Sequence, residues 1–192
     1  MPYYYYGFDP TYFLVIIGAV ICMIASARVK STYNKYSQYR SASGMTGAQA
    51  AQRILNSAGI YDVTIQHVSG NLTDHYNPSA KTLNLSDSVY NSTSVAAVGV
   101  AAHECGHAIQ DATNYAPLNI RSAIVPAANI GSQLSWPLFI AGLIFSIHPL
   151  VTLGIALFSL AVLFQLVTLP VEINASSRAL TMLETTGILG TD

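Results

Sequence analysis

The chain has 192 residues, of which 52% are hydrophobic and only 9% are charged, and its formal net charge is -1. About a quarter of the residues in an ordinary soluble domain are charged, so the composition argues against a soluble globular protein and favours a lipid bilayer as its surroundings. The near-neutral balance, without a run of basic residues, excludes the electrostatic footprint expected of a nucleic-acid-binding protein.

The first apolar segment covers residues 10–27 and carries no charged side chain, so it is long enough to cross hydrocarbon as a helix. A cleaved signal peptide is the alternative, because residues 25–27 resemble a cleavage site. A signal peptide, however, carries positive charge before its apolar core. Here the basic residues follow the segment: Arg28, Lys30, Lys35 and Arg40. The positive-inside rule therefore predicts an uncleaved anchor with its N-terminus outside, and the tyrosines at positions 3–6 are expected in the outer headgroup layer.

Residues 28–121 hold seven of the eight Lys and Arg residues and are predicted to form a small α+β domain. Thr46 and Gln49 have the spacing of a capping box at the start of a helix. Alternating apolar and polar residues then predict a strand over 61–68, and a second short strand is expected over 81–86.

The most informative pattern is the pentad HECGH at residues 103–107, which is HExxH in an apolar stretch that is typical of a helix. A cap within residues 92–94 is expected to start this helix, which continues to about Asp111. Residues four apart lie on one face of a helix, so the imidazoles of His103 and His107 can bind one metal ion, with Glu104 beside its open position. The pattern predicts a zinc peptidase site. The alternative is a chance pentad, or two buried histidines bonded to neighbours.

A second stretch without charge covers residues 122–171 and is interrupted by His148-Pro149. Fifty residues are too many for one membrane crossing but suit two helices joined by a tight turn. The predicted hairpin has arms over residues 124–147 and 150–169. Several polar residues and prolines lie in the first arm: Pro126, Asn129, Ser132, Gln133 and Pro137. We expect these to face other helices or the site rather than lipid.

Catalytic zinc usually has three protein ligands and one open position, so two histidines need a partner. The pattern HExxHxxGxxH is excluded, because Gln110 and Thr113 stand at the required positions. The two glutamates after the pentad are Glu172 and Glu184. The hairpin topology favours Glu172, since it returns the chain to the side of the pentad. The alternative role for Glu172 is a carboxylate at a helix N-terminus, with Pro170 in the first turn.

Four segments occur in the same order as in a known family: TDHYNP, LNLSDSVY, AAHECGHAIQ and LPVEINASSRAL. With them the chain resembles the YugP-like membrane neutral zinc metallopeptidases over nearly its whole length. The resemblance implies Zn²⁺ as cofactor, with His103, His107 and Glu172 as its ligands and Glu104 as the catalytic base. It also implies a zincin-like fold for the small domain.

Residues 172–179 are also similar to the region of HtpX-like peptidases that supplies the third zinc ligand. Ser176 stands where those enzymes have aspartate, so Asn174 or Ser176 is expected to orient the metal ligands instead. The family generally continues beyond the position of Asp192 into another apolar segment.

A tetrahedral oxyanion needs a hydrogen-bond donor besides the metal, and His75, Tyr76 and Arg178 are candidates. Each also has a structural alternative, in a turn, in packing or in an ion pair. Asp74 has two interpretations, as a carboxylate that orients a zinc-bound imidazole or as a turn residue. The strand over 81–86 is the predicted edge along which an extended substrate binds.

The sequence therefore predicts a mainly α-helical integral membrane protein with a small α+β zincin-like metallopeptidase domain and three transmembrane helices. Its expected parts are an anchor (1–27), the zincin-like domain (28–121), the transmembrane hairpin (122–170) and a C-terminal helix with the third ligand (171–192).

The predicted function is that of a zinc endopeptidase in the inner or plasma membrane, multi-pass, with its active site on the cytoplasmic side. Its substrates are expected to be misfolded or membrane-associated polypeptides. A non-catalytic zinc-binding scaffold or adaptor is the main alternative. A transporter is disfavoured, because the apolar spans lack ionisable residues. The oligomeric state is left open by the sequence.

Overall fold

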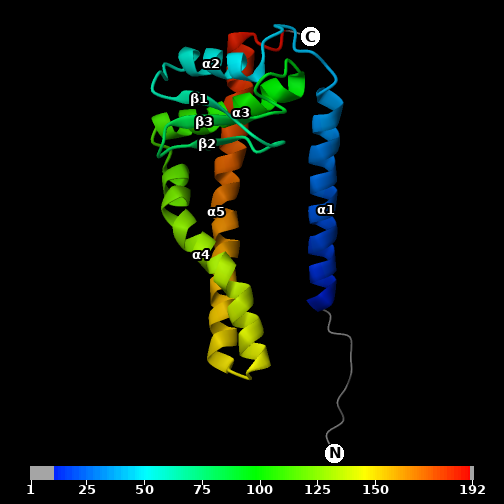
Figure 1. The fold of residues 1–192 in the computed structure, drawn as a ribbon, viewed down its shortest axis with the longest axis vertical. Coiled ribbons are helices and arrows are strands. Elements are labelled where there is room, and N and C mark those ends of the chain that lie inside the picture. The colour runs from blue at the N-terminus through cyan, green and yellow to red at the C-terminus, as the bar shows by residue number, and fades with distance from the viewer. Residues whose placement is uncertain (1–10, 191–192) are drawn as a thin grey trace, which may run out of the picture.

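The computed structural model describes residues 11–190 and shows a mainly helical protein with a small three-stranded sheet, as the sequence predicts. Three long helices extend away from one end of the molecule, and the sheet with two shorter helices forms that end (Figure 1). In chain order the elements are α1 (Thr11–Tyr36), α2 (Gly47–Ser57), β1 (Thr64–Val68), β2 (His75–Asn77), β3 (Thr82–Ser86), α3 (Val95–Ala112), α4 (Ala116–Ile144) and α5 (His148–Thr186). The tyrosines at positions 3–6 lie outside the described residues.

The sheet has the order β1-β3-β2, with β1 parallel and β2 antiparallel to β3. The strand predicted over residues 81–86 is thus the central strand, and its prediction as an edge was wrong. β2 forms one edge of the sheet, and its residue Tyr76 lies opposite Leu83 of β3. With three residues, β2 is too short to show the alternation that identifies a strand in sequence. β1 begins at Thr64, three residues later than predicted.

The core of the small domain lies between the sheet and the helices α2 and α3. Leu83 and Leu85 of β3 are fully buried, as are Ile54 and Leu55 of α2. The predicted capping box at the start of α2 is confirmed: Gln49 N donates to Thr46 Oγ1 at 3.2 Å, and Thr46 N donates to Gln49 Oε1 at 3.0 Å. This cap fixes where the helix begins and therefore which face it buries.

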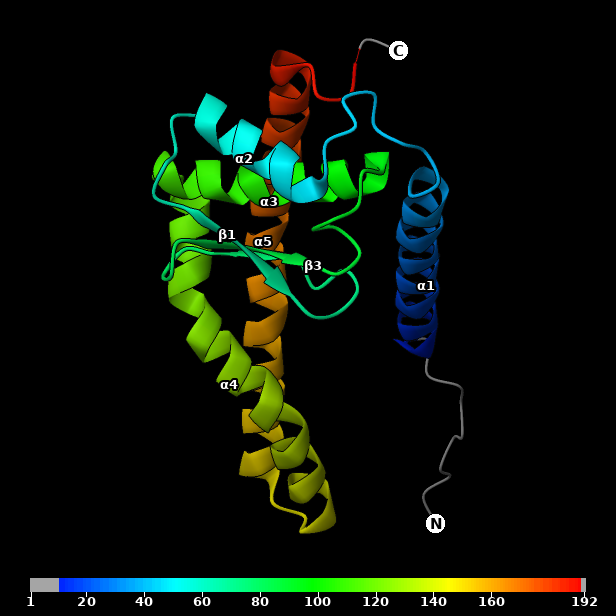
Figure 2. The ribbon, with the colours of Figure 1, turned by 45° about the horizontal axis from the view of Figure 1, so that its top comes forward.

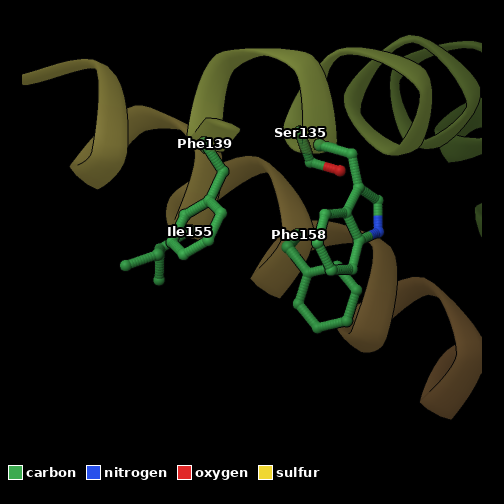
Figure 3. A pocket seen from close by; sticks show the side chains of 6 residues that line it. Ser135, Phe139, Ile155 and Phe158 are labelled. Carbon is green, nitrogen blue, oxygen red and sulfur yellow. The ribbon is translucent and has the colours of Figure 1, made fainter. Parts of the chain in front are cut away.

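The predicted hairpin is formed by α4 and α5, which cross closely because small residues lie at their contact. A Cβ atom on Gly154 would lie 2.9 Å from both the Phe139 nitrogen and the Ser135 oxygen. Beside this crossing is a small apolar pocket of about 180 Å³ (Figure 3). Glycine at such a position lets two helix backbones approach, as in helix pairs within lipid.

Among residues 11–190, two helices are long and apolar enough to cross a membrane, Tyr12–Tyr36 and His148–Thr186. The apolar stretch of α1 has no buried residue. α4 does not meet the same criterion, so three transmembrane helices are not confirmed. The start of α1 and the turn between α4 and α5 both lie away from the sheet, on the same side of it along the long axis (Figure 1).

α5 continues without a break through Pro170 and ends at Thr186. A new helix beginning near Pro170, the alternative structural role for Glu172, was therefore wrong. Proline inside a helix removes one backbone hydrogen bond, but here packing against the rest of the protein maintains the helix on both sides. Glu172 is thus held on the same helix as the second hairpin arm.

Candidate metal centre

The two histidines of the pentad lie on one face of α3. Ser94 caps this helix as expected, with its side chain accepting a hydrogen bond from Ala97 N at 3.2 Å. Because His103 and His107 are one turn apart, their rings meet edge to face, with centroids 4.9 Å apart. The helix therefore places both rings on the same side of α3.

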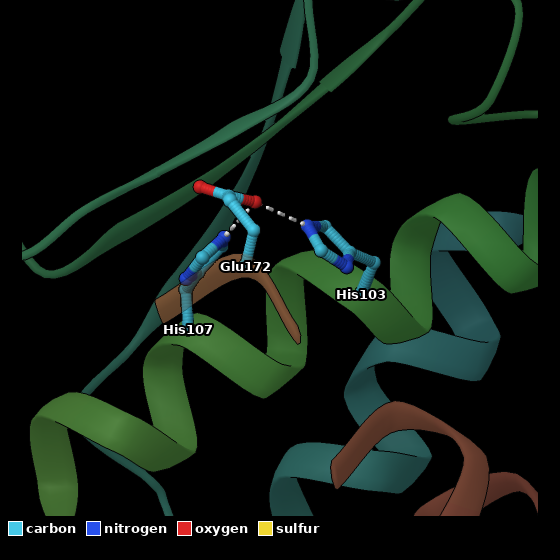
Figure 4. Close-up of side chains that lie close together, drawn as sticks. All are labelled: His103, His107 and Glu172. Carbon is cyan, nitrogen blue, oxygen red and sulfur yellow. Dashed lines mark hydrogen bonds and ion pairs between the residues drawn. The ribbon is translucent and has the colours of Figure 1, made fainter. Parts of the chain in front are cut away.

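Glu172 of α5 reaches the same point from the other side (Figure 4). Its Oε2 atom lies 3.2 Å from His103 Nε2 and 3.4 Å from His107 Nε2. One donor atom from each of the three residues lies within 4.8 Å of the others. The structure therefore brings together the three residues that the sequence selected.

The donor set fits a zinc ion. In a tetrahedral site with zinc bonds of about 2.0–2.1 Å, neighbouring donor atoms lie roughly 3.3 Å apart, close to the separations of Glu172 from the two imidazoles. The outer ring nitrogens have other partners: His103 Nδ1 lies 3.1 Å from Ser176 Oγ, and His107 Nδ1 lies 3.0 Å from Gln110 Oε1. Both Nε2 atoms are thus directed at the shared point, which is the arrangement that supports metal-bound histidine.

A glycine inside the pentad permits α5 to come this close. A Cβ atom on Gly106 would collide with the carbonyl oxygen of Ala175 and lie 3.0 Å from its carbonyl carbon. Ala175 is three residues beyond Glu172 on α5. The small residue at position 106 therefore determines whether the carboxylate of Glu172 can reach the imidazoles.

Gln110, which the sequence analysis used only to exclude a third histidine, connects the two helices of the site. It is fully buried. Its Oε1 atom accepts from His107, while its Nε2 atom donates to Val171 O at 2.8 Å and to Asn174 Oδ1 at 3.0 Å. The signal that could have found it is its spacing, since a residue three positions after His107 lies on the same helix face. Of the two predicted orienting residues, Ser176 contacts an imidazole directly, whereas Asn174 does so through Gln110.

Glu104 is almost completely buried, with 8% of its surface exposed. Its Oε2 atom accepts a hydrogen bond from the backbone nitrogen of Tyr76 in β2 at 3.0 Å. Burial raises the pKa of the Glu104 carboxyl above its ordinary value, and the His107 and His103 imidazoles and the Tyr76 N–H oppose this rise. The carboxylate is thus fixed between the edge strand and the two histidines.

These residues face a cleft of about 590 Å³. β2 supplies one wall and the first turns of α4 supply the other, including Arg121. The guanidinium Nη1 atom lies 3.6 Å from Glu172 Oε1, and the Nε atom is buried without a hydrogen-bond partner among the described residues. In the sequence, Arg121 marks only the start of the uncharged stretch. Its position as the last cation before the apolar hairpin was the available signal.

The other predicted residues have partners of their own. Asp74 lines the cleft, but its carboxylate accepts hydrogen bonds from the Ser86 nitrogen at 2.7 Å and the Ser86 hydroxyl at 2.9 Å, and among residues 11–190 no hydrogen bond joins it to an imidazole. Neither predicted role of Asp74 is therefore seen. The His75 ring is also at the cleft, and its Nδ1 atom lies 2.9 Å from Thr73 O.

Two candidate oxyanion donors are likewise paired. The Tyr76 hydroxyl donates to Asp111 Oδ2 at 2.7 Å, while Tyr76 itself borders the cleft. Arg178 Nε donates to Asn174 Oδ1 at 2.8 Å, and its guanidinium lies over the Tyr115 ring. Arg178 is therefore directed at the packing between helices, whereas Arg121 is the arginine at the cleft.

Comparison with known proteins identifies the family of the chain. A family model described as "Putative neutral zinc metallopeptidase" matches residues 11–192. The protein described as "Putative membrane protease YugP" from Bacillus subtilis (strain 168) is 45% identical over 177 residues, which cover 92% of this chain and 79% of that protein. No solved structure gives a significant match. The predicted resemblance is thus confirmed, and the chain belongs to the YugP-like family of neutral zinc metallopeptidases, with Zn²⁺ as its cofactor.

Proposed function

We propose that the protein is a membrane-embedded zinc endopeptidase that uses Glu104 as its general base. The zinc ligands in this proposal are His103, His107 and Glu172. The observation that carries it is the convergence of three donor atoms within 4.8 Å, with both outer imidazole nitrogens already bonded to other groups. Both Nε2 atoms are directed at one carboxylate oxygen, which is the arrangement that a shared metal ion requires.

When bound, the zinc ion supplies a Lewis acid that polarises the scissile carbonyl and makes a water molecule more acidic. Glu104 accepts a proton from that water at a carboxylate oxygen as the water oxygen bonds to the carbonyl carbon. The same carboxylate then delivers the proton to the amine nitrogen as the peptide C–N bond breaks. The Tyr76 N–H keeps the carboxylate oriented throughout, since it holds Oε2 at 3.0 Å.

The extended substrate is proposed to bind along β2, which is the edge strand that borders the cleft. Strand addition satisfies the backbone of a peptide without regard to its side chains. Tyr76 N is directed at Glu104 rather than at β3, so this edge faces the proposed catalytic groups. A peptide bound there lies next to the carboxylate that handles the proton.

The orientation in the membrane is proposed from the ends of the long helices. The start of α1 and the turn between α4 and α5 both lie on one side of the site along the long axis (Figure 1). The basic residues Arg28, Lys30 and Lys35 are at the site end of α1, which the positive-inside rule assigns to the cytoplasm.

Cysteine labelling in whole cells tests this orientation. In a Cys22→Ser background, an impermeant maleimide should label Ser146→Cys in the α4–α5 turn without permeabilisation. Ser57→Cys on α2 should be labelled only after permeabilisation. Both serines are exposed, so the reverse pattern would contradict the topology rather than reflect burial.

Catalysis is tested by Glu104→Gln, which keeps the shape of the side chain and removes the base. We expect this variant to retain zinc and to lose cleavage of an unfolded reporter protein. His103→Ala should lose both, and His67→Ala, on β1 and paired with Asp87, should lose neither. Equal proteolysis by the wild-type protein and Glu104→Gln would leave a zinc-binding scaffold as the better description.

A further inference from the structure

A second cavity lies on the other side of the candidate metal centre. We call it the α1–α3 groove; its volume is about 530 Å³, and its walls include Val29, Thr32, Tyr36, Val95, Gly99 and Val100. The N-terminal end of α3 faces α1 and its C-terminal end lies over α4 (Figure 2). The groove and the cleft are therefore arranged one after the other along α3.

The two cavities share a residue. His103 lines the groove as well as the cleft. The two cavities therefore adjoin at this side chain, on either side of the proposed metal ligand. Because the groove borders the proposed zinc ligand itself, the occupant that fits this position best is a part of the same polypeptide that binds in the cleft.

The surface of the groove is mainly apolar. Val29 is 67% exposed and Leu72 is 43% exposed, although both are large hydrophobic residues. The Tyr33 hydroxyl is already occupied, because it donates to Ser88 O at 3.2 Å. Burial of an apolar side chain against such walls is favourable, whereas a charged side chain would lose hydration on entering among mainly apolar groups.

Gly99 marks a place in the groove where an added side chain would have room. It lies in the interior of α3, one turn before His103, where glycine is less favourable for the helix than alanine. A Cβ atom at this position would meet no heavy atom within 4 Å in the described part of the chain. Unlike Gly106, it is therefore not required by packing, and the missing side chain leaves open space on the face that carries His103.

We infer that the α1–α3 groove accepts a bulky apolar side chain of the polypeptide substrate next to the bond that is cleaved, and that Gly99 provides the room for it. The inference rests on the proposed peptidase function and adds a substrate class to it. The groove begins where α1 leaves its apolar stretch, since Arg28 also lines it. Apolar segments that emerge from the membrane surface are thus the substrates it selects.

The test compares Gly99→Leu with Gly18→Leu, a matched control in α1 where an added Cβ also meets open space. Each protein is purified in full length and given quenched fluorescent peptides that differ only in Phe, Leu, Ala or Asp beside the cleavage site. The wild-type protein and the control should prefer Phe and Leu. Gly99→Leu should lower kcat/KM for these peptides about tenfold or more, mainly through KM, while cleavage of the Ala peptide changes little.

A binding measurement separates this inference from the catalytic proposal. In a Glu104→Gln background, a peptide with benzophenone in place of Phe should crosslink to groove residues of α1 or α3, and Gly99→Leu should abolish the crosslink. Zinc content should be unchanged by Gly99→Leu, and its melting temperature should be no lower than that of the wild-type protein. Gly99→Ala serves as a smaller second variant.

The unfavourable outcomes are distinct. If the wild-type protein cleaves no peptide, the peptidase proposal fails. If it cleaves with the same preference in Gly99→Leu, the groove inference is overturned. It is also overturned if a photoreactive fatty acid labels the groove and the peptide does not, since the occupant is then a lipid chain.

Discussion

His107 and Gln110 form a hydrogen bond within α3, with Nδ1 and Oε1 3.0 Å apart. The amide end of Gln110 donates to α5, at Val171 O and Asn174 Oδ1. One buried side chain thus orients a proposed zinc ligand and also ties its helix to the helix that carries Glu172. Ligand geometry and helix packing are coupled at this residue.

Replacing Gln110 with Ala should weaken zinc binding by about 10–100-fold, which is the usual effect of losing a group that orients a metal-bound histidine. The buried partners left unsatisfied should also lower the free energy of unfolding by about 1–3 kcal/mol. Competition with a zinc chelator and thermal unfolding measure the two effects. Gln52→Ala is the control, because that side chain is exposed and bonds to Asn56. Wild-type zinc affinity in Gln110→Ala would contradict the orienting role.

Alanine at Gly106 and alanine at Gly99 should have opposite effects on stability, although both residues lie in α3. At Gly106 the new Cβ collides with Ala175 O, so overpacking should cost about 1–3 kcal/mol and displace Glu172 from the imidazoles. At Gly99 the Cβ meets open space, so the higher helix propensity should add up to about 1 kcal/mol. Thermal unfolding in one detergent, with zinc content measured in parallel, compares them. A stabilised Gly106→Ala would show that α5 can move without cost.

Glu172→Gln should lose stoichiometric zinc, because it replaces the charged donor on α5. The matched control is Glu184→Gln, which changes the other glutamate after the pentad; Glu184 lies in the last turn of α5 and lines neither the cleft nor the groove. Metal content after dialysis, measured by mass spectrometry, distinguishes the two. Retention of zinc by Glu172→Gln together with its loss from Glu184→Gln would assign the third ligand to Glu184.

Arg121→Met should lower zinc affinity about tenfold, because the guanidinium 3.6 Å from Glu172 Oε1 supports that carboxylate. Arg121→Lys should recover only part of the affinity, since a lysine keeps the charge without the planar fork. Arg53→Met is the control, as Arg53 donates to Thr186 O away from the cleft. An unchanged affinity in Arg121→Met would leave Arg121 with no role in holding Glu172.

The helix that carries the site was readable from sequence because its signals are local. Ser94 caps α3 three residues before the nitrogen it binds, and His103 and His107 are placed by the period of the helix alone. The capping box of α2 is local in the same way. The selection of Glu172 over Glu184 needed only a count of apolar segments and the usual number of zinc ligands.

Other features depended on contacts between distant parts of the chain. The central position of β3 was missed because strand order is set by long-range pairing, and β2 was missed because three residues carry no period. The role of Gln110 needs α5 beside α3, and that of Arg121 needs the first turns of α4 beside Glu172.

The sequence by itself determined the chemistry of the site, since residue type and helical spacing fix which donors share a face. Only the tertiary structure decided how those donors are held and what lies around them. The reason is physical: the hydrogen bond of Ser176 to His103, the open space at Gly99 and the close approach at Gly106 exist only once α1 and α5 are placed against α3. Packing between helices is cooperative, and no local pattern encodes it.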